Sequence, residues 1–199
     1  MDNINYFTGD KEEDDITMFL ILQQVEFKSG TVRRNMFKNL KANPGGSMLY
    51  GLTWKSYLSK EKSRTPSKYK GLCHTKVMDD YPDLEIIFKQ YRDKYFPTFE
   101  YKSVQMNHNF KCPPHKDSSN IGYSILCGFG DYEGGQCCVD FDGNVKKYDV
   151  RFDYLKFNGS KYTHWVEPWK GERYTLVYFD NLSNRQLTLR EKLIECNGN

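Results

Sequence analysis

The sequence has no long apolar run, since the longest covers only the five residues 18–22. A membrane-spanning helix needs roughly 20 apolar residues, so we expect no membrane segment. The first fifteen residues, MDNINYFTGDKEEDD, are polar and acidic and lack the basic and apolar regions of a signal peptide. We therefore expect residues 1–15 to form a loose acidic tail.

Cysteines at metal-binding or disulfide-framework spacing are also missing. The six Cys include no CxxC motif, which argues against a structural zinc site and against a disulfide-rich secreted domain. Cys137 and Cys138 are adjacent within an expected strand, so their side chains should point to opposite faces. These features favour a reducing compartment, either the cytoplasm or the nucleus.

Neither sign of charge dominates, because 29 Lys and Arg face 26 Asp and Glu for a net charge of +3. Such mild basicity permits contact with nucleic acid or another acidic surface but does not require it. The local exception is residues 55–70, which are rich in Lys and Arg and contain one Glu. We expect an exposed basic loop there, and most such loops are simply solvated surface.

What the chain does contain is aromatic residues, with 15 Tyr and 13 Phe that can fill a β-rich core. Residues 82–96 show one apolar stripe at helical spacing and predict the clearest helix. Residues 16–27 are apolar enough for the core, as either helix or strand, and residues 31–43 predict a short helix. Residues 187–196 predict a closing helix.

Beyond residue 99, short runs rich in Val, Ile, Tyr and Phe alternate with Gly, Asn and Asp, which is typical of an antiparallel sandwich or barrel. We expect a single domain that is mixed but mainly β, in which a helical N-terminal part (16–99) packs on a β-core (100–180) and a C-terminal helix (181–199) follows. The candidate strands are residues 100–106, 122–129, 136–141, 145–150, 153–157, 162–166 and 173–179.

Histidine is scarce, with four in the chain. His115 and Asp117 are two residues apart after two prolines that favour extended backbone, so both side chains should lie on one face. An imidazole and a carboxylate are two of the three ligands in a 2-His-1-carboxylate metal site. His164, in the strand-rich half, is the best third ligand, and His74 and His108 are weaker alternatives. An isolated HxD is a common incidental pattern, so the rest of the chain must support it.

That support comes from Arg173 and Thr175, which share one face of the last candidate strand. A cosubstrate with two carboxylates needs a buried cation for its far end, and the guanidinium fork binds a carboxylate through two hydrogen bonds. The turn between His164 and Arg173 can fold the chain back, so one cavity can receive both side chains. Standing alone, Arg173 is equally consistent with a surface residue.

Together, His115-Lys-Asp117, His164 and Arg173-Tyr-Thr175 resemble the motif of the 2-oxoglutarate/Fe(II)-dependent dioxygenases: HxD, a distal His, then Arg-x-Ser/Thr. The glycine-containing segment 130–136 also resembles the family's hairpin after the HxD strand. The resemblance implies a double-stranded β-helix (jelly roll) over residues 100–180.

By the same resemblance, His115, Asp117 and His164 hold Fe(II) as the catalytic triad, and Arg173 and Thr175 bind 2-oxoglutarate. Dioxygen is the other cosubstrate, and ascorbate is a candidate reductant. The implied enzyme is an oxidoreductase that hydroxylates a C–H bond and releases succinate and carbon dioxide.

A finer resemblance joins NHNFKCPPHKDSSNIG (107–122), GDYEGG and GERYTLVYF to the TET/JBP branch, which oxidises the methyl group of 5-methylpyrimidines in nucleic acid. It implies that Asn107 or Asn109 contacts the cosubstrate and favours a nucleic-acid substrate over protein. The 55–70 segment then offers cations for phosphates, with Trp54, Tyr57 and Tyr69 nearby for base stacking.

Three alternatives stay open. A prolyl or other protein side-chain hydroxylase uses the same triad. A non-catalytic β-sandwich binding module could carry an incidental HxD. A metal-bound lyase or isomerase of similar fold would leave Arg173 and Thr175 unexplained.

Overall fold

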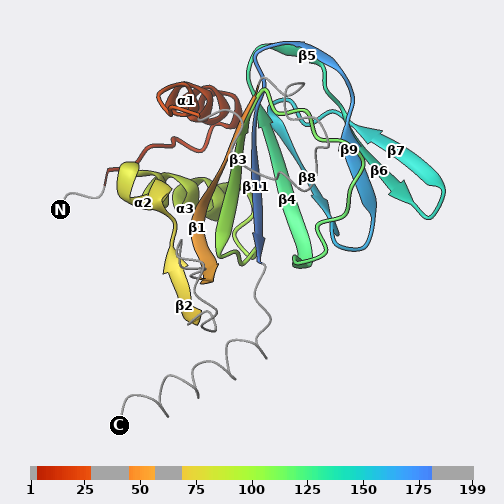
Figure 1. The fold of residues 1–199 in the computed structure, drawn as a ribbon. Helices are drawn as coiled ribbons and strands as arrows, with labels where there is room; N and C mark the ends of the chain where they lie inside the picture. Colours follow the sequence, from red (N-terminus) through yellow and green to blue (C-terminus); the bar gives the residue numbers. More distant parts are fainter. Residues whose placement is uncertain (1–3, 28–44, 57–68, 181–199) are drawn as a thin grey trace.

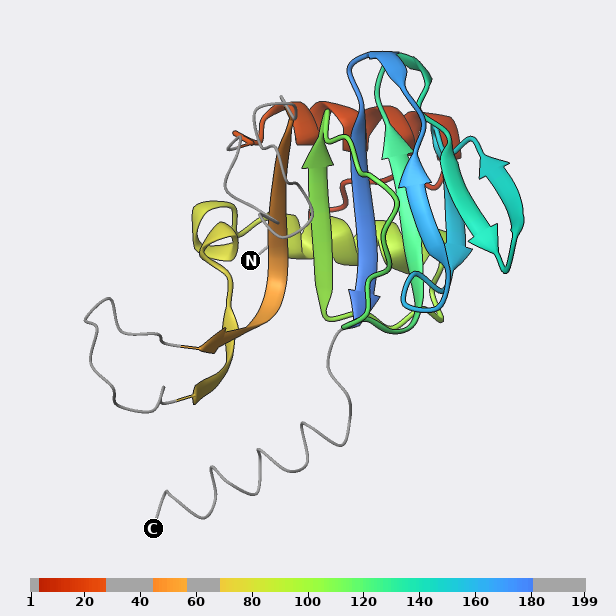
Figure 2. The ribbon, with the colours of Figure 1, turned by 45° about the vertical axis from the view of Figure 1, so that its right-hand side comes forward.

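Two antiparallel sheets face each other in this structure (Figures 1 and 2). The structure is a computed structural model that describes residues 4–27, 45–56 and 69–180, with the backbone alone for 53–56 and 69–73. The helices are α1 (Lys11–Gln23), α2 (Lys76–Asp80) and α3 (Leu84–Tyr95). The strands are β1 (Gly46–Ser56), β2 (Tyr69–His74), β3 (Ser103–His108), β4 (Ile121–Phe129), β5 (Tyr132–Gly134), β6 (Cys137–Phe141), β7 (Asn144–Tyr148), β8 (Asp153–Phe157), β9 (Thr163–Val166), β10 (Trp169–Gly171) and β11 (Tyr174–Asp180).

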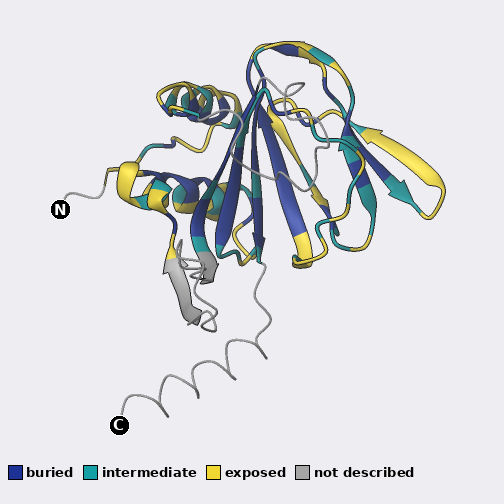
Figure 3. Cartoon of the chain, viewed as in Figure 1, coloured by how far each residue is buried: buried dark blue, intermediate teal, exposed yellow. Residues whose placement is uncertain are grey.

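The larger sheet has six strands in the order β2-β1-β3-β11-β4-β8. Its central strands are buried on both faces (Figure 3), and strand alternation gives each face its own set of side chains. Met106, Leu176 and Tyr178 pack in the core that also contains the apolar residues of α1 and α3. Asn107 and Thr175, one residue out of phase with these, instead line a cavity toward the second sheet.

The second sheet is smaller, with three strands in the order β7-β6-β9, and a two-stranded ribbon pairs β10 with β5. A second apolar cluster fills the space beside the cavity, contributed by Leu126, Cys137, Val139, Val150 and Phe157. The fold is therefore mixed but mainly β, with a double-stranded β-helix core and helices packed on its outer face. The seven predicted strands and the 82–96 helix are confirmed to within a few residues.

The N-terminal part differs from the expectation. Residues 11–15 are not a loose tail but the first turns of α1, and Asp10 caps the helix by accepting hydrogen bonds from the backbone N–H groups of Glu12 and Glu13. Asp14 and Asp15 are buried at its inner face. The tail prediction was wrong because it was made from composition alone, whereas the partners of these carboxylates come from distant parts of the chain.

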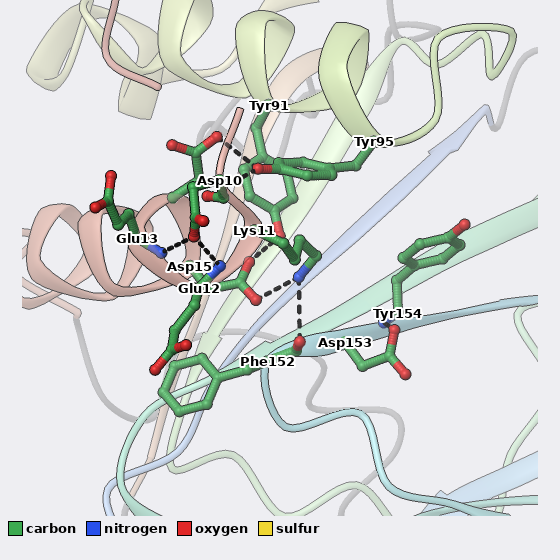
Figure 4. A network of polar contacts seen from close by, with 11 residues as sticks. Asp10, Lys11, Glu12, Glu13, Asp15, Tyr91, Tyr95, Phe152, Asp153 and Tyr154 are labelled. Atoms are coloured by element: carbon green, nitrogen blue, oxygen red, sulfur yellow. Dashed lines mark hydrogen bonds and ion pairs between the residues drawn. The ribbon is translucent and has the colours of Figure 1, made fainter. Parts of the chain in front are cut away.

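Those partners form the polar network in Figure 4. Asp15 accepts hydrogen bonds from the Tyr91 hydroxyl, at 2.5 Å, and from the Lys11 ammonium. Lys11 also donates to the Phe152 carbonyl oxygen, 3.1 Å away, which joins α1 to the turn before β8. Burial raises the pKa of Asp15 above its usual value, although Lys11 and Tyr91 oppose the effect.

Asp14 has the opposite balance. Burial raises its pKa, but hydrogen bonds from the Tyr95 hydroxyl and from the backbone N–H groups of Thr8 and Gly9 bring the pKa below its usual value. The Tyr95 hydroxyl lies 2.5 Å from Asp14 Oδ2. Two tyrosines of α3 thus hold two neighbouring carboxylates of α1, one each.

The region 16–99 was expected to be helical, yet it also supplies β1 and β2. β1 pairs with β3 and so belongs to the larger sheet. The 31–43 helix, the closing helix in 181–199 and most of the basic 55–70 segment lie outside the described residues. Among the described residues, no helix is both long and apolar enough to cross a membrane.

Candidate active site

Three predicted ligands meet between the two sheets. His115 and His164 form an antiparallel bridge in which each backbone N–H donates to the other's carbonyl oxygen, at 3.0 and 2.9 Å. Asp117 is fixed by its own N–H, which donates to the Gly159 carbonyl oxygen at 2.9 Å. One nitrogen or oxygen atom from each of the three side chains lies within 4.8 Å of the others.

The side chains are oriented so that the same nitrogen of each imidazole faces the carboxylate. His115 Nε2 lies 3.5 Å from Asp117 Oδ1, and His164 Nε2 lies 3.6 Å from Asp117 Oδ2. Each Nδ1 is turned to a backbone carbonyl oxygen, that of Pro113 at 2.8 Å or that of Tyr162 at 3.1 Å. A carbonyl partner favours a proton on Nδ1, so Nε2 is the atom of each ring that would bind a cation beside Asp117.

Electrostatics and packing support a cation at this point. Burial lowers the pKa of His115, but hydrogen bonds with Asp117 and Cys112 outweigh it and raise the pKa to about 10. The Asp117 carboxylate thus favours a positive charge at this position. Packing is close as well: a Cβ on Gly159 would lie 3.3 Å from His164 Cε1 and 3.4 Å from Asp117 Oδ2.

Arg173 lies at another wall of the same cavity, immediately before β11. The side chain is buried, with the residue only 5% exposed. Its backbone is clamped by Asn109, whose Oδ1 accepts from the Arg173 N–H at 2.9 Å and whose N–H donates to the Arg173 carbonyl oxygen at 2.8 Å. Among the described residues, Arg173 Nε has no hydrogen-bond partner, and no carboxylate forms an ion pair with the guanidinium. Burial of an unpaired positive charge costs free energy unless a bound anion balances it.

A polar row on the larger sheet connects the site to β1. Register places Ser47 and Thr175 on either side of Asn107. Asn107 donates to Thr175 Oγ1 at 3.1 Å and accepts from Ser47 Oγ at 2.6 Å, and Gln105 donates to Ser47 Oγ at 2.9 Å. The row therefore fixes the rotamers of the polar groups that face the cavity.

The cavity has a volume of about 80 Å³, against roughly 10–15 Å³ needed by one water on the same measure. It can take a small organic molecule rather than a single solvent molecule. Its lining includes the three clustered residues, Arg173, Thr175 and Asn107, together with apolar side chains such as Leu126, Phe157 and Val177.

Three predicted candidates lie elsewhere. Asn109 supports the Arg173 backbone rather than lining the cavity, so Asn107 is the better placed of the two asparagines. His108 stacks on Tyr174 with ring centroids 4.3 Å apart, outside the cavity. His74 is exposed and also outside it.

Sequence reasoning missed several neighbours of the site. Tyr132 and Trp169 contact the Arg173 guanidinium, and Cys112 Sγ lies 3.4 Å from His115 Nδ1. The only signal for Tyr132 was its place in the glycine segment 130–136. That segment has positive φ at Gly130, Gly134 and Gly135, and it also contains β5, which pairs with β10.

No family model and no curated protein sequence matches this chain. Among solved structures, an oxidoreductase of the 2OG-Fe(II) oxygenase family from Burkholderia pseudomallei is 18% identical, with a TM-score of 0.40. That match covers 54% of this chain and 60% of the length of the Burkholderia protein.

Two further structures cover more of the chain. NgTET1 in complex with 5mC DNA is 20% identical over 73% of this chain and 69% of that one, with a TM-score of 0.49. A Trichoplax adhaerens prolyl hydroxylase, in complex with a hypoxia inducible factor peptide, is 16% identical over 89% of this chain and 82% of its own, also with a TM-score of 0.49. One architecture can support unrelated functions, so the function must be argued from the site.

Proposed function

We propose that this chain is an Fe(II)- and 2-oxoglutarate-dependent dioxygenase, an oxidoreductase that hydroxylates a C–H bond and releases succinate and carbon dioxide. One observation carries the proposal. Two imidazoles and a carboxylate share a cavity with a buried guanidinium that is ion-paired with no described residue. A binding module with an incidental HxD would give no reason for the guanidinium to be there.

The residues fit both groups. Two imidazole nitrogens and one carboxylate are the donor set of non-haem Fe(II) sites that keep open positions, and here His115, Asp117 and His164 would hold the metal. Arg173 fits the distal carboxylate of 2-oxoglutarate, because a guanidinium binds a carboxylate through two hydrogen bonds. The Thr175 hydroxyl, on the same face of β11, would add a third.

When bound, the iron supplies dioxygen activation coupled to oxidative decarboxylation of 2-oxoglutarate. The chain itself binds, orients and excludes water. Arg173 sets the position of the cosubstrate along the cavity, and Asn107 keeps the Thr175 hydroxyl in place. Leu126, Phe157 and Val177 give the cavity apolar walls, which strengthens each polar contact inside.

Succinate formation tests the proposal. Purified protein should convert 2-oxoglutarate to succinate in the presence of Fe(II), ascorbate and air, and His164→Ala should abolish the reaction. His108→Ala is the matched control, because it removes a histidine that lies outside the cavity. Calorimetry with Mn(II)-loaded protein gives a second measurement that needs no turnover. If neither succinate nor 2-oxoglutarate binding is detected, the proposal is wrong.

For the substrate, we propose the methyl group of a 5-methylpyrimidine in nucleic acid. The support is the resemblance of the sequences of segments 107–122, 130–135 and 171–179 to the TET/JBP branch. The Lys and Arg of residues 55–70, which offer cations for phosphates, add to it. A base in a duplex must be flipped out, or presented on a single strand, to reach an enclosed site.

A substrate panel decides this point. Methylated DNA, RNA and a proline-rich peptide set should be incubated with enzyme, Fe(II) and 2-oxoglutarate, and the products analysed by mass spectrometry. We expect oxidised pyrimidine, with binding that weakens as salt rises because phosphate contacts release counterions. A peptide that gains one oxygen while all pyrimidines stay unchanged would make the chain a protein hydroxylase instead.

A further inference from the structure

Two aromatic rings lie against the Arg173 side chain. Its Cζ is 5.4 Å from the centroid of the Tyr132 ring and 5.5 Å from that of the Trp169 ring. Both distances are within the range at which a cation is attracted to a ring face. Tyr132 is itself only 2% exposed, so this contact is shielded from water.

The two rings are brought together by the β5–β10 ribbon. Trp169 pairs with Gly134, and Gly171 pairs with Tyr132. Tyr132 and Gly134 are two residues apart on one strand, so Tyr132 and Trp169 lie diagonally on the same face of the ribbon. Gly134 has no side chain to fill the space between them.

Gly135 lies against a further side of the Arg173 side chain. Its φ is +67°, and a Cβ built there would lie 3.0 Å from Arg173 Nε and 3.1 Å from Cδ. The backbone of the 130–136 segment therefore touches the arginine stem directly. Asn109, which follows β3, binds the Arg173 backbone. Arg173 is therefore held at its backbone, along its side chain and at its guanidinium.

Both the ring and the hydroxyl of Tyr132 act on Arg173. Burial raises the pKa of Tyr132, and the Arg173 guanidinium opposes this effect, so the hydroxyl lies near the charge. The hydroxyl oxygen nevertheless makes no hydrogen bond of normal geometry with a described residue. Removing the oxygen should therefore cost less than removing the ring, which should release the guanidinium.

We infer that Tyr132 and Trp169 are positioning residues that fix the Arg173 guanidinium between the β5–β10 ribbon and the cavity. In doing so they set both the affinity and the length selectivity of the site for a 2-oxo dicarboxylate. The inference rests on the proposed function. The ring faces partly compensate the buried charge when no ligand is bound, and they prevent the guanidinium from shifting toward a longer or shorter acid.

The test compares Tyr132→Leu and Trp169→Leu with Tyr132→Phe. Tyr123→Leu is the matched control, because Tyr123 makes the same kind of contact with Lys156, at 5.4 Å, outside the cavity. The measurement is calorimetric titration of Mn(II)-loaded protein with 2-oxoglutarate and with 2-oxoadipate, which is one carbon longer. Mn(II) affinity is measured separately for each variant.

Both Leu variants should bind 2-oxoglutarate about tenfold more weakly and discriminate less against 2-oxoadipate, with unchanged Mn(II) affinity. Tyr132→Phe and Tyr123→Leu should stay within about twofold of the wild type. Leu variants that bind like the wild type, or a Phe variant that loses as much as the Leu variant, would overturn the inference. If one Leu variant does not fold, the other decides. A wild-type protein that binds no 2-oxoglutarate would overturn the proposed function as well, so the two failures are distinguishable.

Discussion

Replacing Arg173 with Met separates the ligand-binding role of this residue from any structural role. In the ligand-free protein the guanidinium is buried and ion-paired with no described residue. Burial alone lowers its pKa below the usual value. Methionine is unbranched, is similar in length and makes favourable contacts with aromatic rings. We therefore expect the free energy of unfolding to change by less than about 1.5 kcal/mol, as for other volume-conserving core changes.

The effect on 2-oxoglutarate should be far larger. A desolvated carboxylate that loses its charged partner costs about 3–5 kcal/mol, which is roughly two to three and a half decades in Kd. Calorimetric titration of Mn(II)-loaded protein measures the loss, and denaturant unfolding of the ligand-free protein measures stability. If the variant binds 2-oxoglutarate normally, the distal carboxylate lies elsewhere. A loss of stability as large as the loss of binding would mean that Arg173 is mainly structural.

Three other changes test neighbouring features. Asp117→Ala should weaken Mn(II) binding by more than the roughly 10–100-fold typical of outer-shell changes, as electron paramagnetic resonance would show; unchanged binding would remove Asp117 from the ligand set. Gly135→Ala should displace Arg173 and weaken 2-oxoglutarate binding by about tenfold, whereas Gly143→Ala, also at positive φ but with open space around it, should change stability alone; equal binding losses would contradict the contact. Asp14→Asn should destabilise the fold by about 1.5–3 kcal/mol at pH 7. Because the folded-state pKa of Asp14 is lowered, its contribution is present above the unfolded value of about 4 and is lost as pH falls through the folded pKa, so unfolding curves of variant and wild type should converge in acid; a gap that persists there would contradict the pKa direction.

Strong local patterns made part of this structure predictable. The apolar stripe of residues 82–96 became α3, and its buried residues are Leu84, Ile87, Phe88 and Tyr91. The HxD spacing placed His115 and Asp117 together, because a period of two needs only extended backbone. His164 followed from the scarcity of histidine and the strand-rich setting.

Features that depend on distant pairing were not predictable. The acidic start of α1 was mistaken for a tail because Tyr91 and Tyr95, which bind its carboxylates, lie more than 70 residues away. β1 was missed because it begins at a Pro-Gly-Gly sequence (44–46) that was interpreted only as the end of the preceding helix. Trp169 was missed as a neighbour of Arg173 because that contact depends on the pairing of β10 with β5.

The two ends of the site are carried by different hydrogen-bonded ladders. His164 belongs to the three-stranded sheet, whereas Thr175 belongs to the six-stranded sheet and Arg173 directly precedes the same strand. A molecule that touches both ends therefore joins two walls that belong to different hydrogen-bonded sheets. A metal bound at one wall would restrict the relative motion of the two walls, so a dicarboxylate that binds second would lose less conformational entropy. The same holds when the dicarboxylate binds first. By thermodynamic reciprocity, the gain in affinity is the same in either order of addition.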